Sequence, residues 1–382
     1  MKLFVLNQTC NHPMCMLLTM LMSMITFTSR AQVAIDETNF PDENFRKYLL
    51  AQSYGEDGVL TDEEIKEVAE IDVGSKISSD KISSLKGIEH FTALETLICY
   101  NNQLTALDVS NNMALEMLWC AYNQLTALDV SNNTALEVLA CDYNQLTALD
   151  VSNNTALKTL TCIGNQLTAL DVSKNMALEG LFCVNNQLTA LDVSENTALE
   201  NLWFGGNQLT ALDLSKNPAL QELSCPNNQL TALDVSNNTA LKTLSCNGNQ
   251  LTALDVSKNM ALEGLSCYNN QINGAAMDAL ISSLPENTGE SISFLVIYND
   301  EETIDGNVCT KVQVATAIAK GWQPMEWKNG MWMPCEGNDA TDHINTAVIS
   351  SGPQSLFTLS GQRLAAPRKG LNIRGGKKIV VK

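Results

Sequence analysis

The chain has 382 residues, of which 45% are hydrophobic and only 5% aromatic, so it is long enough for a large core or several small domains. It carries 42 acidic and 23 basic residues, which gives a formal net charge of −19 at pH 7. Nucleic acids and anionic lipids are bound by clustered Lys and Arg, so this balance argues against both as partners.

Residues 1–31 are expected to form a signal peptide. Lys2 precedes an apolar run, Met14–Phe27, and the small residues Ser29 and Ala31 occupy the −3 and −1 places of a cleavage site before Gln32. An uncleaved anchor is the alternative, although the run is short for a transmembrane helix. No other stretch is apolar enough, so no membrane span is expected after signal cleavage.

Residues 32–90 are expected to form a helical cap. The segment "FPDENFRKYLLAQSYGEDGVLTDEEIKEVAEIDV" predicts two helices around a turn, with Thr61 and Glu64 as a capping box at the start of the second. The segment resembles EF-hand-like caps of bacterial repeat proteins. Aligning Gly58 with the glycine of a calcium loop puts Ser53 and Gly55 where acidic or amide ligands belong, so calcium is disfavoured but stays an alternative.

Residues 91–272 repeat one 21-residue phrase. "LETLICYNNQL", from Leu94 to Leu104, fits the frame L-x-x-L-x-C-x-x-N-x-L. The pattern resembles leucine-rich repeats of bacterial surface proteins, both internalin-like and BspA-like. This resemblance implies an α/β solenoid, a leucine-rich-repeat horseshoe with a parallel concave β-sheet, whose repeats must stack because one repeat cannot fold alone. The frame restarts without insertion at Leu115, Leu136, Leu157, Leu178, Leu199, Leu220, Leu241 and Leu262.

One cysteine column runs through the repeats and is interrupted once, by Phe204. Parallel neighbours in register point their side chains the same way, which is a poor geometry for disulfides, so we expect a buried ladder of thiols. Scattered disulfides or a metal site are the alternatives. We expect the bulk of Phe204 to disturb the core locally, with Gly205 and Gly206 relieving strain. The column contains Cys99, Cys120, Cys141, Cys162, Cys183, Cys225, Cys246 and Cys267.

Two polar columns accompany the cysteines. Asparagines from Asn102 to Asn270 stand where each strand turns away, and we expect them to bond to backbone groups left unpaired there. Aspartates from Asp108 to Asp255 precede a serine two residues later, which favours Asx turns. Weak calcium binding along this acidic ladder is the alternative.

Residues that vary between copies identify the candidate ligand-binding surface. The strand positions that point away from the leucines should line the concave face. Exposed aromatic side chains often mark binding surfaces. A protein ligand is expected and a glycan is possible, whereas mere shielding of the neighbouring backbone is the alternative. The predicted recognition residues are Trp119, Tyr122, Tyr143, Phe182 and Trp203.

Residues 273–335 are expected to be divergent repeats that close the solenoid. A helix over Asn273–Pro285, an apolar strand in "SISFLVIYND" and a second helix in "TKVQVATAIAKGW" are predicted. Cys309 and Cys335 lie off the ladder, and whether they pair is open. Three tryptophans in this region are expected to pack rather than bind; they are Trp322, Trp327 and Trp332.

The last segments differ in charge and composition from the repeats. Residues 336–352 resemble a linker, and residues 353–382 are basic and predict three short strands. The motifs "SGQRL", "PRKGL" and "GGKKIVVK" resemble the C-terminal sorting domains of type IX secretion in Bacteroidota. "LNIRGG" departs from that pattern, because an aromatic residue usually follows the KGL element. A small β appendage with a positive patch is the alternative.

No catalytic constellation is present in the sequence. The three histidines, His12, His90 and His343, have no cysteine or serine partner at useful spacing, and phosphate-loop, metalloprotease and nucleophile-elbow motifs are absent. We therefore expect a non-catalytic protein without cofactor or metal, secreted or held at the outer-membrane cell surface, that mediates protein–protein interaction or adhesion. A structural spacer that binds calcium and a carbohydrate-binding accessory protein are the alternatives.

Overall fold

The computed structural model describes residues 32–74, 80–287, 293–299, 305–328 and 331–338, and four short strands of the tail. The predicted signal peptide and residues 339–352 lie outside the described residues. The chain divides into two compact units, residues 1–177 and 178–382, and each is described by itself.

The first unit begins with a small helical and hairpin-like element. Strands β1 (Gln32–Ala34) and β2 (Val59–Thr61) pair antiparallel, and helices α2 (Glu43–Leu50) and α3 (Asp62–Glu67) follow them in turn. The predicted capping box is confirmed, because Thr61 and Glu64 bond reciprocally at the start of α3. Asp42 caps α2 and also accepts bonds from the amide and hydroxyl of Ser83, which ties this helix to the first repeat.

The second predicted helix ends earlier than expected. Glu70–Asp72 forms strand β3, which pairs in parallel with the next strand instead of continuing α3. The physical reason is packing: Ile71 is fully buried, and Val68 and Val73 are also buried on the same side. These three β-branched residues occupy inward positions of the repeat frame, with Ile71 beside Leu97 in the sheet. The first repeat therefore begins about one turn before the predicted array.

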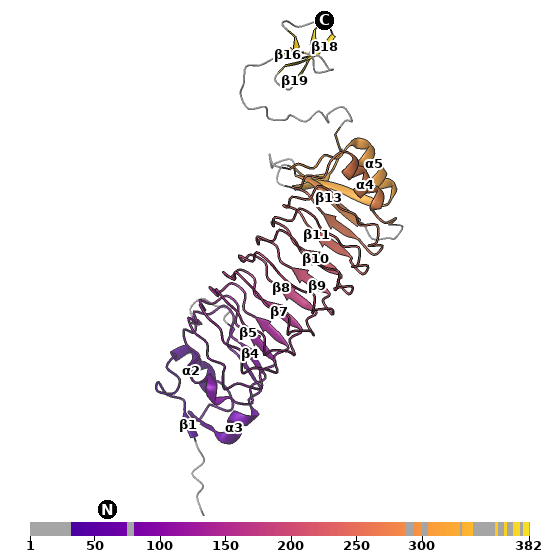
Figure 1. Cartoon of the computed structure of the whole chain (residues 1–382). Coiled ribbons are helices and arrows are strands. Elements are labelled where there is room, and N and C mark those ends of the chain that lie inside the picture. Colours follow the sequence, from indigo (N-terminus) through magenta and orange to yellow (C-terminus); the bar gives the residue numbers. More distant parts are fainter. Residues whose placement is uncertain are drawn as a thin grey trace, which may run out of the picture. The chain divides into compact units, whose positions relative to one another are not determined.

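Parallel strands of three residues make up the sheet of the first unit (Figure 1). Each pairs in register with the next, as in Leu97 beside Leu118 and Leu118 beside Leu139. After β3 the strands are β4 (Thr96–Ile98), β5 (Met117–Trp119), β6 (Val138–Ala140) and β7 (Thr159–Thr161).

The second unit continues the same repeat and ends in a different way. Its short parallel strands are β8 (Gly180–Phe182), β9 (Asn201–Trp203), β10 (Glu222–Ser224), β11 (Thr243–Ser245) and β12 (Gly264–Ser266). Longer strands β13 (Ser293–Asn299) and β14 (Trp322–Lys328) extend the parallel sheet, and β15 (Met331–Pro334) adds an antiparallel edge.

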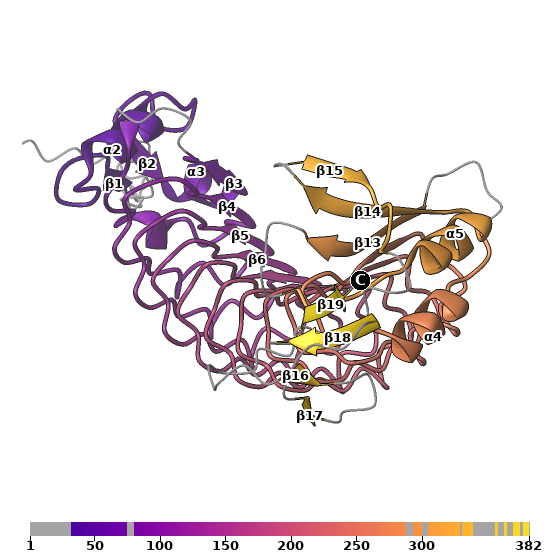
Figure 2. The same ribbon diagram turned by 90° about the horizontal axis from the view of Figure 1, so that it is seen from above.

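Two helices accompany these longer strands, as predicted. Helix α4 (Ala275–Ser283) packs against α5 (Lys311–Ala319), and α5 packs against β14 (Figure 2). Thr310 and Gln313 form a capping box at the start of α5, which the sequence analysis did not identify. Strands β13 and β14 have seven residues each, whereas β8 to β12 have three.

Leucine, valine and cysteine side chains fill the interior of every repeat. In one copy Leu136, Leu139 and Cys141 are fully buried, and the same columns are buried in the others. All ten cysteines of the described residues are thiols, which confirms the buried ladder and leaves Cys309 and Cys335 as separate buried thiols. Burial raises the pKa of these thiols, to about 12 for Cys183 and Cys225, because a thiolate loses solvation in a dry core.

Phe204 takes the place of a thiol and is also fully buried. A Cβ on the following residue, Gly205, would lie 2.8 Å from the ring of Pro226. Gly206 has φ +66°, and a Cβ there would clash with the side-chain oxygen of Asn185. Close approach therefore favours glycine at both places, and the positive φ favours it further at Gly206, where most other repeats have asparagine or glycine.

The predicted asparagine column is confirmed in its structural role. Asn144 donates from Nδ2 to the carbonyls of Cys120 and Cys141, both at 3.1 Å, and its Oδ1 accepts the amide of Leu125 at 3.0 Å. A second asparagine column, missed in the sequence analysis, is buried one half-turn later. There Asn154 donates to the carbonyls of Val130 and Asn133 at 2.9 and 2.8 Å.

The tail contains four short strands where three were predicted. They are β16 (Leu356–Phe357), β17 (Arg363–Leu364), β18 (Gly370–Arg374) and β19 (Lys377–Val381). They form an antiparallel sheet in the order β17-β16-β18-β19. Within the described parts of the chain, no helix is both long and apolar enough to cross a bilayer.

Candidate functional site

The open face of the sheet is formed by strand residues that point away from the leucine core. Successive side chains of a strand alternate between faces, so Met117 and Trp119 point outward when Leu118 points inward. Trp119 is 41% exposed, and Met117 is exposed as well. The predicted outward orientation of Trp119 is therefore what the structure shows, whereas Met117 was not singled out from the sequence.

Tyr122 and Tyr143 stack on one another just beyond the strands of the first unit. Their ring centroids are 4.5 Å apart, and the ring planes are inclined by 16°. The two rings remain 54% and 45% exposed. A Cβ on Gly164 would lie 2.7 Å from the Tyr143 ring, so this ring packs directly over the glycine backbone of the next repeat. The structure thus brings these two predicted residues together.

Both tyrosines occupy a backbone conformation that bulky residues rarely adopt. Tyr122 has φ +56° and Tyr143 has φ +49°, in the left-handed region. Such a conformation costs a non-glycine residue about 1–2 kcal/mol. In every other repeat this column holds asparagine or glycine, which tolerate the region; these are Asn101, Gly164, Asn185, Gly206, Asn227, Gly248 and Asn269.

Asp142 lies beside the tyrosine stack on the open face and is half-buried. Its Oδ1 accepts hydrogen bonds from the Thr161 hydroxyl and from the amide of Ile163. Burial raises the pKa of this carboxyl above its ordinary value, and the two hydrogen bonds act in the opposite direction. The sequence analysis assigned Asp142 no role.

Phe182 and Trp203 form a separate aromatic pair in the second unit. They are neighbours on paired strands, and their rings meet edge to face with centroids 5.1 Å apart. Trp203 is exposed and Phe182 is half-buried. The five predicted residues therefore belong to two groups, one in each unit.

A third aromatic group lies at the end of the second unit. Trp332 contacts Trp327 and Tyr268, with centroids 4.8 and 5.6 Å away, and remains exposed. Phe294 of β13 is exposed as well. Trp322 differs, because it is buried and its indole donates to the carbonyl of Pro285 at 2.9 Å. Packing, as predicted for all three tryptophans, describes Trp322 fully and the other two only in part.

The aspartate ladder forms Asx turns, as predicted. The amide of Ser152 donates to Oδ1 of Asp150 at 2.9 Å, and the same contact recurs along the ladder. These bonds from the serine hydroxyl and amide lower the pKa of Asp150. Among the described residues no group of three or more His, Cys, Asp or Glu is arranged to hold a metal ion.

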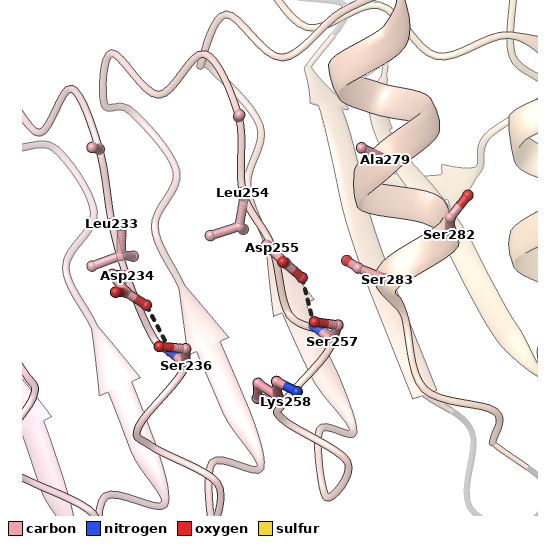
Figure 3. Close-up of a pocket in the computed structure, with 12 residues that line it drawn as sticks. Leu233, Asp234, Ser236, Leu254, Asp255, Ser257, Lys258, Ala279, Ser282 and Ser283 are labelled. Atoms are coloured by element: carbon pink, nitrogen blue, oxygen red, sulfur yellow. Dashed lines mark hydrogen bonds between the residues drawn. The ribbon is translucent and has the colours of Figure 1, made fainter.

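A groove of about 670 Å³ lies between α4 and the last repeats of the second unit (Figure 3). Its polar groups already have partners in the chain. Ser257 donates to Asp255, Ser283 accepts the amide of Val256, and Ser282 donates to the carbonyl of Asp278. The groove therefore presents few unmet polar groups to a ligand, and the open face is the stronger candidate site.

Comparison with known proteins places the repeats among solved structures of the same kind. A family model described as "Leucine Rich repeats (2 copies)" matches residues 218–259. No curated protein matches the chain. The functional domain of InlJ from Listeria monocytogenes, described as including a cysteine ladder, is 33% identical with a TM-score of 0.62. That match covers 73% of this chain, which in turn spans 61% of the length of the InlJ structure.

Two further structures agree in fold alone. The internalin InlF from Listeria monocytogenes is 21% identical over 78% of this chain and 92% of its own, with a TM-score of 0.59. The protein LIC12759 from Leptospira interrogans, described as an LRR protein, is 23% identical over 64% of this chain and 62% of its own, with a TM-score of 0.53.

Proposed function

We propose that this leucine-rich-repeat protein, whose solved neighbours include internalins, is a non-catalytic binding protein that captures a protein ligand on the open face of its sheet. The proposed contact residues are Trp119, Tyr122 and Tyr143 in the first unit, and Phe182 and Trp203 in the second. The fold supports the proposal because stacked repeats offer an extended surface whose variable positions can diverge without affecting the core.

The observation that carries the proposal is the conformation of the two tyrosines. Asparagine or glycine would relieve the left-handed strain at Tyr122 and Tyr143, and both occur in the same column elsewhere. Stacking of the rings returns only about 0.5–1.5 kcal/mol. Strained residues that persist while about half exposed are typical of functional surfaces. Aromatic side chains of this kind dominate binding energy at protein interfaces.

Secretion and surface localisation are part of the same proposal. The apolar run Met14–Phe27 before a small-residue cleavage site supports export, with residues 1–31 as the signal. The tail motifs in residues 353–382, after a linker over residues 336–352, support type IX secretion in a Bacteroidota-like cell. Residues 32–90 would then act as the N-terminal cap, 91–272 as the array and 273–335 as the C-terminal cap, because each end of a solenoid must cover its apolar surface.

The experiment compares single variants of the mature chain in a capture assay. Trp119→Ala and Trp203→Ala are immobilised beside wild type and beside Thr147→Ala, an exposed position in the repeat away from the open face. Mucosal extract is passed over each, and the amount of the same captured protein is measured together with the melting temperature. We expect at least one tryptophan variant to lose about tenfold in capture, with unchanged melting temperature, as about 1.4 kcal/mol of binding energy would give.

Retention of wild-type capture by both tryptophan variants would overturn the proposal. If glycosidase treatment of the extract abolishes capture while protease treatment does not, the carbohydrate-binding alternative is favoured. The assay therefore separates the two ligand classes at the same surface.

A further inference from the structure

Charge is distributed unevenly along the repeats. From Gly87 to Leu157 the sequence has no lysine and no arginine. A cation that approaches this part of the first unit therefore meets mainly carboxylates, with Lys158, paired to Glu137 at 2.7 Å, as the positive charge at its edge. The acidic residues of this stretch are Glu89, Glu95, Asp108, Glu116, Asp129, Glu137, Asp142 and Asp150.

One of these carboxylates, Asp142, stands among the exposed aromatic residues. Trp119 lies directly beside Ala140 in the paired strands, and the amide of Tyr122 donates to the carbonyl of Asp142 at 2.8 Å. Sheet spacing puts the Cα atoms of Trp119 and Asp142 about 8 Å apart. The residue between Trp119 and Tyr122 on this face is Ala121, which is short and buried. We call Trp119, Tyr122, Tyr143 and Asp142 the aromatic–acidic patch.

The hydrogen bonds of Asp142 orient its carboxylate. Oδ1 accepts both the Thr161 hydroxyl and the Ile163 amide, which fixes the side chain in one orientation. Both of these hydrogen bonds end on the same oxygen. A half-buried carboxylate held in one orientation favours a positively charged donor, because partial burial strengthens the attraction.

The aromatic pair of Phe182 and Trp203 in the second unit lacks the equivalent carboxylate. The residues that occupy the position of Asp142 beside Phe182 and Trp203 are Val184 and Gly205, and neither carries a charge. Lys216 also returns positive charge to the repeats of the second unit. The second aromatic pair is thus a natural comparison within the same chain: aromatic residues without the carboxylate.

We propose that the aromatic–acidic patch recognises a cationic side chain, a lysine or arginine, on the protein ligand. This inference rests on the proposed function. The ammonium or guanidinium group pairs with the carboxylate of Asp142, and the exposed ring of Trp119 contacts the same cation. A cation placed over an aromatic ring is attracted by the negative charge on the ring face, and more strongly when the pair is desolvated. The strained tyrosines are then retained because they complete this site.

The test titrates the full mature chain with capped tripeptides and follows the indole N–H signals by NMR. The probes are acetyl-Gly-Lys-Gly-amide, acetyl-Gly-Arg-Gly-amide and acetyl-Gly-norleucine-Gly-amide, the last being a neutral match for lysine. We expect the two cationic peptides to shift the Trp119 signal and the norleucine peptide to bind at least about tenfold more weakly. Asp142→Asn keeps the shape and the acceptor but should weaken the cationic peptides about tenfold, and added salt should weaken them further.

Asp150→Asn is the matched control, since it removes the same charge from an exposed ladder position outside the patch and should change binding by less than about twofold. Equal effects of the two aspartate variants, or equal binding of all three peptides, would overturn the inference. Galactose or N-acetylglucosamine shifting the Trp119 signal while the cationic peptides do not would assign the patch to a glycan and overturn it also. If the peptides fail while Trp119→Ala abolishes protein capture, this inference fails and the proposed function stands; if Trp119→Ala captures normally, the proposal for the first unit fails instead.

Discussion

The two buried asparagine columns are equal in residue type and similar in burial, but they should differ in their contribution to stability. Asn144→Ala removes the acceptor of the Leu125 amide, for which the structure shows no other partner in the described residues. The carbonyls of Cys120 and Cys141 each keep a second donor, from Asn123 and Asn165. The main cost is therefore one orphaned buried N–H, about 1–3 kcal/mol, added to the cavity that alanine leaves.

Asn154→Ala creates a cavity of the same size without orphaning a backbone group. The carbonyl of Val130 keeps the amide of Asn133, and the carbonyl of Asn133 keeps the amide of Leu136. The Oδ1 of Asn154 has no donor within the described residues, so truncation also removes a buried, unsatisfied acceptor. We expect Asn144→Ala to destabilise the protein by about 2 kcal/mol more than Asn154→Ala does.

Urea unfolding of both variants and wild type, followed by circular dichroism, measures this difference from the transition midpoints at a common slope. Thr147→Ala serves as an exposed control and should leave the midpoint unchanged. Equal destabilisation by the two asparagine variants, or a larger loss for Asn154→Ala, would refute the argument that backbone satisfaction rather than burial sets the importance of each column.

Three further predictions concern thiols, pH and metal. Burial raises the pKa of the ladder thiols, so a thiol reagent at pH 8 should leave the native mature protein almost unlabelled and modify ten cysteines after denaturation; rapid native labelling would contradict the ladder. Burial also raises the pKa of Asp142, so the folded state holds this proton more tightly than the unfolded state does. Wild type should therefore lose stability relative to Asp142→Asn as the pH rises from about 4 to 7. Equal changes of melting temperature with pH in the two proteins would contradict this. EDTA should leave the melting temperature unchanged, because Asp150 and its equivalents are engaged in Asx turns, whereas a marked loss would favour a calcium-binding spacer.

Much of the fold follows from the repeated frame in the sequence. The predicted solenoid with a parallel sheet is confirmed, because Leu97 and its equivalents define a buried column at fixed spacing and that spacing places one strand in each repeat. The first strand of the repeat sheet, β3, was missed, because Val68, Ile71 and Val73 stand at positions of the repeat frame without leucine and the charged residues around them also suit a helix. A frame that admits any β-branched residue would have found it.

The second asparagine column could also have been predicted. Asn112, Asn133 and Asn154 recur without exception, whereas the residue before each varies elsewhere in the column among Asn, Lys and Glu. A polar residue that is the same in every repeat, beside one that varies between repeats, indicates burial, because solvent-exposed positions tolerate substitution. The first asparagine column was predicted because it stands where each strand turns away and leaves backbone groups unpaired.

The candidate site was predicted in outline and not in detail. Alternation along a strand places Trp119 and Trp203 outward, but the strain at Tyr122 requires knowledge that its column adopts positive φ. The asparagines and glycines at the equivalent positions carried that signal in the sequence. The carboxylate orientation of Asp142 depends on Thr161 in the following repeat, a contact between variable residues that no repeat pattern specifies.

Replacing both strained tyrosines by the residue found at their equivalent positions gives the most direct test of the binding surface. The double variant Tyr122→Asn/Tyr143→Asn relieves left-handed strain and loses one ring stack, so the free energy of unfolding should stay within about 1 kcal/mol of wild type or rise. Capture of the protein ligand by the first unit should fall at least about tenfold in the same preparation. A clear loss of stability together with wild-type capture would show that the tyrosines serve packing, and it would contradict their role in binding.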